Sequence, residues 1–237
     1  MEKINVRQAE IILAMQDKIN RKVDDNWLGS GYPYLRGVLV EAVEALDHYG
    51  WKWWSSEPRD FSLVQIELID MLHFSLSHLI SECDGNLNVA TSVLLSRSNP
   101  KLESCHFDGK EYTLAQCDVP KLLELIAAFA ASGRNELALL EVTCRACCLN
   151  WDQIMVLYIA KHVLNVFRQN HGYKTGRYTK VWGGKEDNSH LIEIVSYLDP
   201  AAANFSMQIY TLLNERYAFY ALLPQPIICA QSDRSDN

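Results

Sequence analysis

Two pairs of carboxylates are spaced so that each pair projects from one face of a helix. Glu41 and Glu44 are three residues apart, and so are Glu67 and Asp70. Side chains at this spacing are neighbours on a helix surface. Taken alone, the first pair is typical of a solvated polar face, because apolar residues cover the opposite side of its helix. The second pair argues for another interpretation.

The second pair lies in a segment that is apolar on nearly every side. Its apolar residues are Leu63, Ile66, Leu68, Ile69, Met71, Leu72, Phe74 and Leu76. A helix of this kind is buried, and an isolated charge inside a protein is very costly. The sequence has no Lys or Arg between Arg59 and Arg97. Glu67 and Asp70 must therefore be protonated, paired with a base from another element, or bound to a cation.

The stretch between the pairs is long enough for one helix to end and the next to return antiparallel. We therefore expect a four-carboxylate metal site between antiparallel helices. Hard oxygen ligands favour Mg²⁺, with Mn²⁺ as a substitute, over zinc. A di-iron site would want a His three residues after a Glu, and neither Glu41 nor Glu67 has one. His73 is a fifth ligand, a side chain that supports or stacks on the ligand, or a core histidine.

A metal bound in this way completes its shell with substrate phosphates, and a basic face follows later in the chain. Lys161, Asn165 and Arg168 share one face of a predicted helix. The next segment, residues 171–188, is rich in glycine and tyrosine and carries further basic residues. These are Lys174, Arg177, Lys180 and Lys185. The pattern favours a loop that closes over a phosphate ligand, and the alternative is a solvated basic loop. It matches neither a Walker A loop nor a dinucleotide fingerprint.

Aromatic and amide side chains offer a further set of candidates. Trp51, Trp53 and Trp54 follow Gly50 at the end of the first carboxylate helix. They suit stacking on a planar ring at the mouth of a pocket, although tryptophan is more often a core residue. Gln16 and Asn20 share a helix face and suit hydrogen bonds to the edge of such a ring. The alternative for both is ordinary solvation.

Helical periodicity dominates the chain and predicts an all-α bundle. We expect helices at residues 6–21, 34–49, 61–82, 120–131, 136–149, 151–169, about 188–198, and 205–223. Residues 83–119 mix a short helix with polar loops and are predicted to be a mobile insert. One domain covers residues 1–223, with a frayed tail at 224–237. Asn188 or Ser189 is the expected cap of the helix that ends near residue 198.

Composition limits the possible functions. The 237 residues are 49% hydrophobic and 22% charged, with 11 Gly and 7 Pro, which is globular and argues against a turn-rich all-β fold. A net charge of −7 argues against broad nucleic-acid binding. The first residues are charged, which argues against a signal peptide. The sequence has no run of about 18 consecutive apolar residues, which argues against a membrane span. Seven cysteines without a secretory signal suggest reduced thiols and a cytoplasmic protein. Cys144 and Cys147 are expected in the core rather than in a redox or zinc pair.

Together these segments resemble the dimeric, all-α dUTPases, within the all-α nucleotide pyrophosphohydrolase superfamily. The similarity covers roughly residues 10–82 and 155–190. The matching stretches are Gln16-Asp-Lys-Ile-Asn20, Tyr34-Leu-Arg, Glu41-Ala-Val-Glu44, Asp47-His-Tyr-Gly-Trp-Lys-Trp-Trp54, Glu67-Leu-Ile-Asp70-Met-Leu-His-Phe, Lys161 with Asn165 and Arg168, and the glycine- and lysine-rich segment 172–188. The two carboxylate pairs are shared across the superfamily, whereas the tryptophan segment and segment 172–188 are specific to this family.

The resemblance implies a homodimer that hydrolyses dUTP, with dUDP or dCTP as further substrates, to the monophosphate. Metal ligands would be Glu41, Glu44, Glu67 and Asp70, with Glu44, assisted by Glu41, orienting the attacking water. Phosphate and sugar contacts would come from Lys161, Asn165, Arg168, Tyr173, Lys174, Lys180, Lys185 and Asn188. The base pocket would comprise Gln16, Asn20, Trp27, Trp53 and His73.

Two departures from the family pattern leave the base preference open. They are the loop at residues 24–33 and Ser55-Ser56, where a further Lys is common. A dual preference for dUTP and dCTP, or another base, is therefore an alternative enzyme function. From another class, a non-catalytic helical interaction module with vestigial carboxylates is also compatible with the fold.

Overall fold

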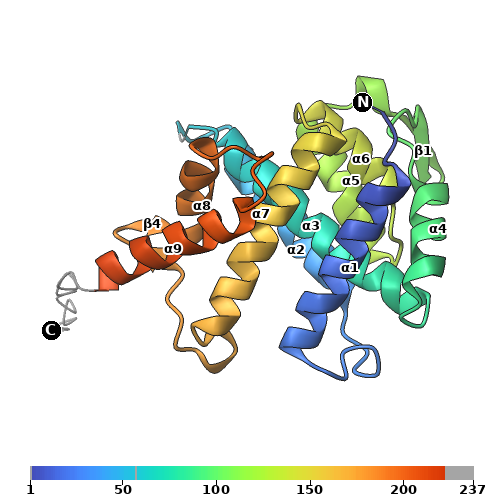
Figure 1. Ribbon diagram of the computed structural model, residues 1–237. Helices are drawn as coiled ribbons and strands as arrows, with labels where there is room; N and C mark the ends of the chain where they lie inside the picture. The colour runs from blue at the N-terminus through green and yellow to red at the C-terminus, as the bar shows by residue number, and fades with distance from the viewer. Residues whose placement is uncertain (1, 57, 222–237) are drawn as a thin grey trace, which may run out of the picture.

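The computed structural model describes residues 2–56 and 58–221, and α-helices dominate this part of the chain (Figure 1). The helices are α1 (Val6–Val23), α2 (Tyr34–Tyr49), α3 (Phe61–Glu82), α4 (Leu87–Arg97), α5 (Val119–Ala131), α6 (Leu137–Ala146), α7 (Trp151–Asn170), α8 (Asp187–Ser196) and α9 (Phe205–Ala221). Two antiparallel hairpins pair β1 (Ser104–Phe107) with β2 (Lys110–Thr113) and β3 (Val181–Trp182) with β4 (Lys185–Glu186). The 3₁₀ turns are η1 (Leu114–Gln116) and η2 (Tyr173–Thr175). The expected all-α class is confirmed.

Helix α3 is the central helix of the bundle. It is buried on most of its circumference, and α1, α2, α6 and α7 all pack against it. By length and composition alone α3 could cross a membrane, but 72% of its apolar window is buried inside the protein. The core helix of a globular protein has these same properties, so the apolar sequence is explained by packing.

Helices α2 and α3 run antiparallel, as their contacts show. His48 lies beside Glu67 near one end, Glu41 lies beside Asp70, and Gly37 faces Phe74 further along. A Cβ added at Gly37 would come within 2.6 Å of the Phe74 ring. Glycine is therefore what lets the helices approach closely here. This register places the two carboxylate pairs opposite each other.

Two hydrophobic clusters stabilise the bundle. The larger one joins α1 to α6 with the first half of α7, through residues such as Leu68 and Tyr158. The smaller one joins the second half of α7 to α8, α9 and the segment before α8, through residues such as Phe167 and Trp182. In Figure 1, α7 runs between these two parts of the molecule. Helices α3 and α7 contribute to both clusters and so fix the two parts relative to each other.

Local sequence signals explain several helix starts. Asn5 with Gln8, and Asn150 with Gln153, form capping boxes at α1 and α7. Asp60 accepts the backbone N–H of Leu63 at the start of α3. The predicted helices at 34–49 and 61–82 are confirmed with the same bounds.

Other local predictions need correction. The cap of α8 is Glu186, not Asn188 or Ser189, because β4 continues directly into the helix. The predicted loop at 171–188 contains η2 and the β3–β4 hairpin. Segment 83–119 contains the expected short helix, α4, and also the β1–β2 hairpin, which was not expected. The predicted end of the last helix at 223 and the predicted tail lie outside the described residues.

Candidate active site

A cavity of about 380 Å³ opens between α1, α2, α3, α7 and the segment that leads into α8. This size is within the range of small-molecule sites. Thirteen of the predicted site residues line it. They are Gln16, Asn20, Glu41, Glu44, Glu67, Asp70, His73, Lys161, Asn165, Arg168, Tyr173, Lys180 and Asn188. The fold thus gathers the carboxylates, the basic face and the amides around one space.

Three carboxylates form a cluster at one wall of the cavity. Oxygens of Glu41, Glu67 and Asp70 lie within 4.8 Å of one another. Glu67 is buried at 2% exposure, whereas Glu41 and Asp70 are partly exposed to the cavity. Glu44 also lines the cavity, but it is exposed and stands outside this group. The structure therefore assembles three of the four predicted ligands, with the fourth nearby.

The cluster carries more negative charge than its neighbours neutralise. Burial, together with the charges of Asp70 and Glu67, raises the pKa of Glu41 to about 9. Burial and the charge of Glu67 also raise the pKa of Glu44. Burial alone would raise the pKa of Glu67, but the hydrogen bond from His48 and the charge of Lys161 lower it. Hard oxygen donors with excess negative charge fit a divalent cation.

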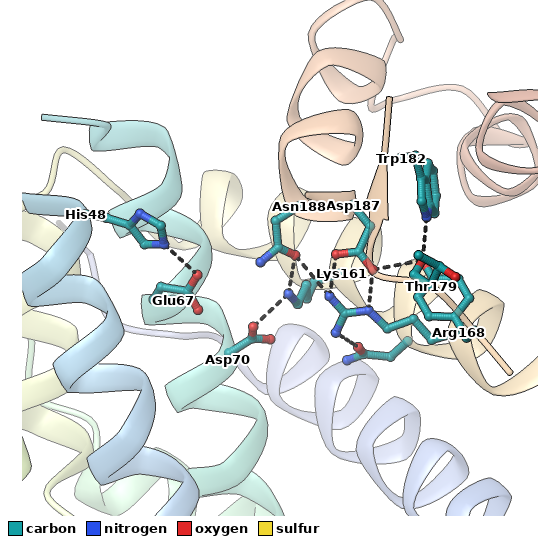
Figure 2. A network of polar contacts seen from close by, with 11 residues as sticks. His48, Glu67, Asp70, Lys161, Arg168, Thr179, Trp182, Asp187 and Asn188 are labelled. Atoms are coloured by element: carbon teal, nitrogen blue, oxygen red, sulfur yellow. Dashed lines mark hydrogen bonds and ion pairs between the residues drawn. The ribbon is translucent and has the colours of Figure 1, made fainter. Parts of the chain in front are cut away.

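Lys161 and His48 are the bases from other helices that pair with the carboxylates of α3. Lys161 on α7 is 1% exposed, and its Nζ lies 2.7 Å from Asp70 Oδ2 and 2.5 Å from Asn188 Oδ1 (Figure 2). His48 on α2 places Nε2 at 3.5 Å from Glu67 Oε1. The hydrogen bond to Glu67 raises the pKa of His48. Of the three alternatives for Glu67 and Asp70, the structure thus shows pairing with a base from another element.

Arg168 is held against the cavity by a buried carboxylate at the start of α8. Its Nε and Nη2 donate to the two oxygens of Asp187, each at 2.8 Å (Figure 2). Asp187 is fully buried and also accepts the Tyr178 hydroxyl at 2.8 Å. Burial opposes ionisation of Asp187, but the hydrogen bond from Arg168 keeps its pKa below the ordinary value. Such a bidentate pair fixes the guanidinium in one orientation.

Amide and ring side chains form the opposite end of the cavity. Gln16 and Asn20 from α1 contact Ser77 of α3 through hydrogen bonds of 2.8 and 3.0 Å. The other side of the Gln16 amide contacts His73 and Tyr158. This end is polar yet buried, which suits recognition of a flat, hydrogen-bonding group rather than a phosphate.

Comparison with known proteins agrees with this geometry. The model of a protein family described as dUTPase matches residues 8–173, which is more than half of the chain. The chain belongs to the dimeric, all-α dUTPase family. A comparison with curated proteins gave no match. The stretch matched to the dUTPase family contains both carboxylate pairs and Arg168, and it ends before Lys180 and Asn188.

Four residues predicted from the resemblance to dUTPases lie outside the cavity. Lys185 is paired with Glu193 at 2.7 Å and is 58% exposed. Trp53 is 84% exposed and packs against the other tryptophans of its segment. Lys174 donates to the Val23 carbonyl and, with Trp27, lines an adjacent cavity of about 600 Å³. The roles given to these residues stay predictions.

Four residues of the site were missed from the sequence. They are His48, Ser77, Tyr158 and Asp187. Helical spacing carries a signal for three of them, because His48 follows Glu44 by four positions, Ser77 follows His73 by four, and Tyr158 precedes Lys161 by three. Asp187 adjoins the predicted Asn188, but nothing in its spacing indicates a buried partner for Arg168.

Cys144 and Cys147 lie in the core, as expected. Both are free and buried, at 2% and 0% exposure. Burial raises the pKa of Cys147 to about 12, so this thiol stays protonated and unreactive.

Proposed function

We propose that this protein hydrolyses dUTP to dUMP and pyrophosphate with the help of Mg²⁺. The observation that carries the proposal is the cluster of Glu41, Glu67 and Asp70, which shares one cavity with a set of basic residues in a chain of the dUTPase family. A divalent metal held by carboxylates, together with basic side chains, would neutralise the negative charge of a triphosphate.

The three clustered carboxylates would hold the metal, with Glu44 as a further ligand. Their oxygens are already within 4.8 Å of one another, and the raised pKa of Glu41 reflects burial and the charges of Asp70 and Glu67, which a cation would neutralise. Bound Mg²⁺ would withdraw charge from phosphate oxygens and bring the triphosphate into line, and Mn²⁺ has the same donor preference.

Glu44 is the proposed general base for the attacking water, with Glu41 beside it. Burial and the charge of Glu67 raise the pKa of Glu44, and a raised pKa brings a carboxylate closer to the range useful for proton transfer. Glu44 is exposed to the cavity, so a water molecule can reach it. The charge of Lys180 opposes this rise in the pKa of Glu44.

Lys161, Arg168 and Lys180 are the proposed phosphate contacts, supported by Asn165, Tyr173 and Asn188. All six line the cavity opposite or beside the carboxylates. Because Asp187 holds Arg168 from behind, its guanidinium needs little reorganisation to meet the charge that develops on the leaving pyrophosphate.

A nucleotide scan tests this function. Pyrophosphate release would be measured for dUTP, dCTP, dTTP and UTP with Mg²⁺, for the wild type and Glu44→Gln. We expect turnover of dUTP that the substitution abolishes. Equal turnover of dUTP and dCTP would favour the dual-specificity alternative. Release from no nucleotide would contradict the proposal and favour a non-catalytic interaction module.

A further inference from the structure

Ser77 fixes the orientation of the Gln16 amide at the ring-binding end of the cavity. Its hydroxyl lies 3.0 Å from the backbone carbonyl of His73, which can only accept a hydrogen bond. Asn20 Oδ1 is a second acceptor at 3.2 Å, but the contact with the carbonyl is shorter, so the single Ser77 proton is directed to this carbonyl. The lone pairs of Ser77 then accept from NH₂ groups, and Gln16 Nε2 lies 2.8 Å away. Gln16 must turn Nε2 toward Ser77 and Oε1 to the other side.

Gln16 Oε1 in turn fixes two protons. It lies 2.6 Å from the Tyr158 hydroxyl and 2.6 Å from His73 Nδ1. A carbonyl oxygen has no proton to give, so both neighbours must donate to it. Tyr158 also lies 3.2 Å from the carbonyl of Ile12, but the shorter contact is the better hydrogen bond. The Tyr158 proton thus points to Gln16, and the proton of the neutral His73 ring sits on Nδ1.

The other ring nitrogen of His73 is left without a partner. Among the described residues nothing bonds to His73 Nε2, although the side chain is only 5% exposed and lines the cavity. Burial holds the pKa of His73 well below its ordinary value, so the ring is neutral. A neutral ring with its proton on Nδ1 presents Nε2 as an acceptor. A buried acceptor without a donor is costly, which points to a ligand N–H as the missing partner.

We propose that Tyr158 is a positioning residue for base recognition: through Gln16 it holds the His73 proton on Nδ1 and leaves Nε2 to accept a ring N–H of the substrate base. The inference rests on the proposed function, because it takes the base to occupy this end of the cavity. Tyr158 is fully buried, and its ring stacks on His73 with centroids 4.1 Å apart, so it holds the imidazole in both position and protonation.

This arrangement distinguishes bases by the proton on the ring nitrogen. Uracil carries a hydrogen on N3, between two carbonyl groups, whereas the N3 of cytosine has only a lone pair. An acceptor at His73 Nε2 pairs with the first and repels the second. With the proton on Nε2 instead, the preference would be reversed. A site of this kind rejects the wrong partner because a buried polar group would be left unpaired.

Tyr158→Phe tests the inference, since it removes one hydroxyl and keeps the ring stack. Nitrogen NMR of labelled histidine would read the His73 tautomer directly, without reference to activity. We expect a protonated Nδ1 and a bare Nε2 in the wild type, and a shift toward protonated Nε2 in the variant. The ratio of kcat/KM for dUTP to that for dCTP should fall about tenfold, the size expected for one hydrogen bond.

Two further variants complete the experiment. Tyr210→Phe removes a hydroxyl that accepts from Asn170 outside the cavity, and it should change neither readout. Ser77→Ala releases the Gln16 amide from the other side and should move the His73 tautomer in the same direction, so it serves if Tyr158→Phe does not fold.

The inference would be overturned by a protonated Nε2 in the wild type. It would equally be overturned if Tyr158→Phe and Ser77→Ala left the tautomer and the base ratio unchanged. A protein that turned over no nucleotide but showed the expected tautomers would contradict the proposed function and leave the positioning role of Tyr158 intact.

Discussion

The protonation of Glu41 reflects the charge and burial of the carboxylate cluster around it. Glu41 is one of three carboxylates in contact range, and nearby cations serve mainly its neighbours: Lys161 pairs with Asp70 and His48 with Glu67. Burial, together with the charges of Asp70 and Glu67, raises the pKa of Glu41. Perturbed pKa values of this kind cluster at functional sites. Here a bound cation would offset the repulsion among the carboxylates.

This charge predicts a pH-dependent effect of metal on stability. The folded protein binds the Glu41 proton more tightly than the unfolded chain does, because its pKa rises from 4.5 to about 9. Stability of the metal-free protein should therefore fall as pH rises through this window. Since Mg²⁺ binds only the ionised form, it should raise the Tm more at about pH 8 than at about pH 5. Thermal unfolding with Mg²⁺ or with chelator measures this, and an equal shift at both pH values would count against a metal at Glu41.

Asp187 leads to a second prediction at the residue scale. Asp187→Asn leaves the buried Arg168 without its counter-charge, which should cost about 3–5 kcal/mol of stability and most of the activity. The matched control is Glu193→Gln, which removes a carboxylate from partly exposed pairs with Lys185 and Arg216 and should cost about 1 kcal/mol or less. Urea unfolding and dUTP turnover measure both. Similar losses in the two variants would show that burial of the Arg168 pair is not what matters.

At the scale of elements, the apolar periodicity of the sequence was enough to predict the two carboxylate helices. The helices at 34–49 and 61–82 follow from their apolar patterns, and their antiparallel pairing brings Glu41 to Glu67 and Asp70. The hairpins escaped prediction because their strands are at most four residues long and show no apolar alternation. Their turns, Asp108-Gly109 and Gly183-Gly184, do carry the left-handed backbone that two-residue turns require.

Contacts between residues on different helices around the cavity could not be predicted from periodicity. Asp187 binds Arg168, 19 positions away, and Tyr158 binds Gln16, 142 positions away. The residue pattern within one helix does not indicate contacts at such separations. The hydrogen-bond polarity of Gln16 likewise follows only from the assembled structure. Most of the candidate site could therefore be predicted as a set of residue types, but not as a network with defined proton positions.

The close approach of α2 and α3 predicts the effect of a small substitution. Gly37→Ala places a Cβ against the Phe74 ring, which itself lines the cavity. Although alanine favours a helix, the overlap should push the helices apart and cost about 1–3 kcal/mol. Val89→Ala on α4 is the control, since Val89 is 46% exposed and should change stability by about 0.5 kcal/mol or less. Urea unfolding measures the stability of both variants. A Gly37→Ala protein more stable than the wild type would show that the helices adjust to the added Cβ without cost.

At the scale of the whole molecule, the exposed apolar residues suggest an interface. Trp51, Trp53 and Trp54 are 44%, 84% and 61% exposed, and Val40 and Val43 on α2 are also exposed. Exposed apolar side chains that cluster, as the three tryptophans do, commonly mark protein–protein contacts. Such an interface agrees with the homodimer that the resemblance to the dimeric dUTPases implies.

Sedimentation equilibrium tests the dimer. We expect a mass of about twice the 27.0 kDa of one chain, and a shift toward one chain for Trp53→Lys. Lys110→Ala, on the β1–β2 hairpin, should leave the mass unchanged and serves as the control. A wild-type mass of one chain would contradict the dimer.

The central claim is that the carboxylate cluster holds the cation on which dUTP hydrolysis depends. The most direct measurement is the rate of pyrophosphate release from dUTP as Mg²⁺ is varied, for the wild type, Glu67→Gln and Glu82→Gln. Glu82 ends the same helix away from the cavity and is the matched control. Turnover that requires Mg²⁺, persists in Glu82→Gln and is lost in a folded Glu67→Gln protein is the predicted result. Full turnover without divalent metal, or an unimpaired Glu67→Gln protein, would contradict the account.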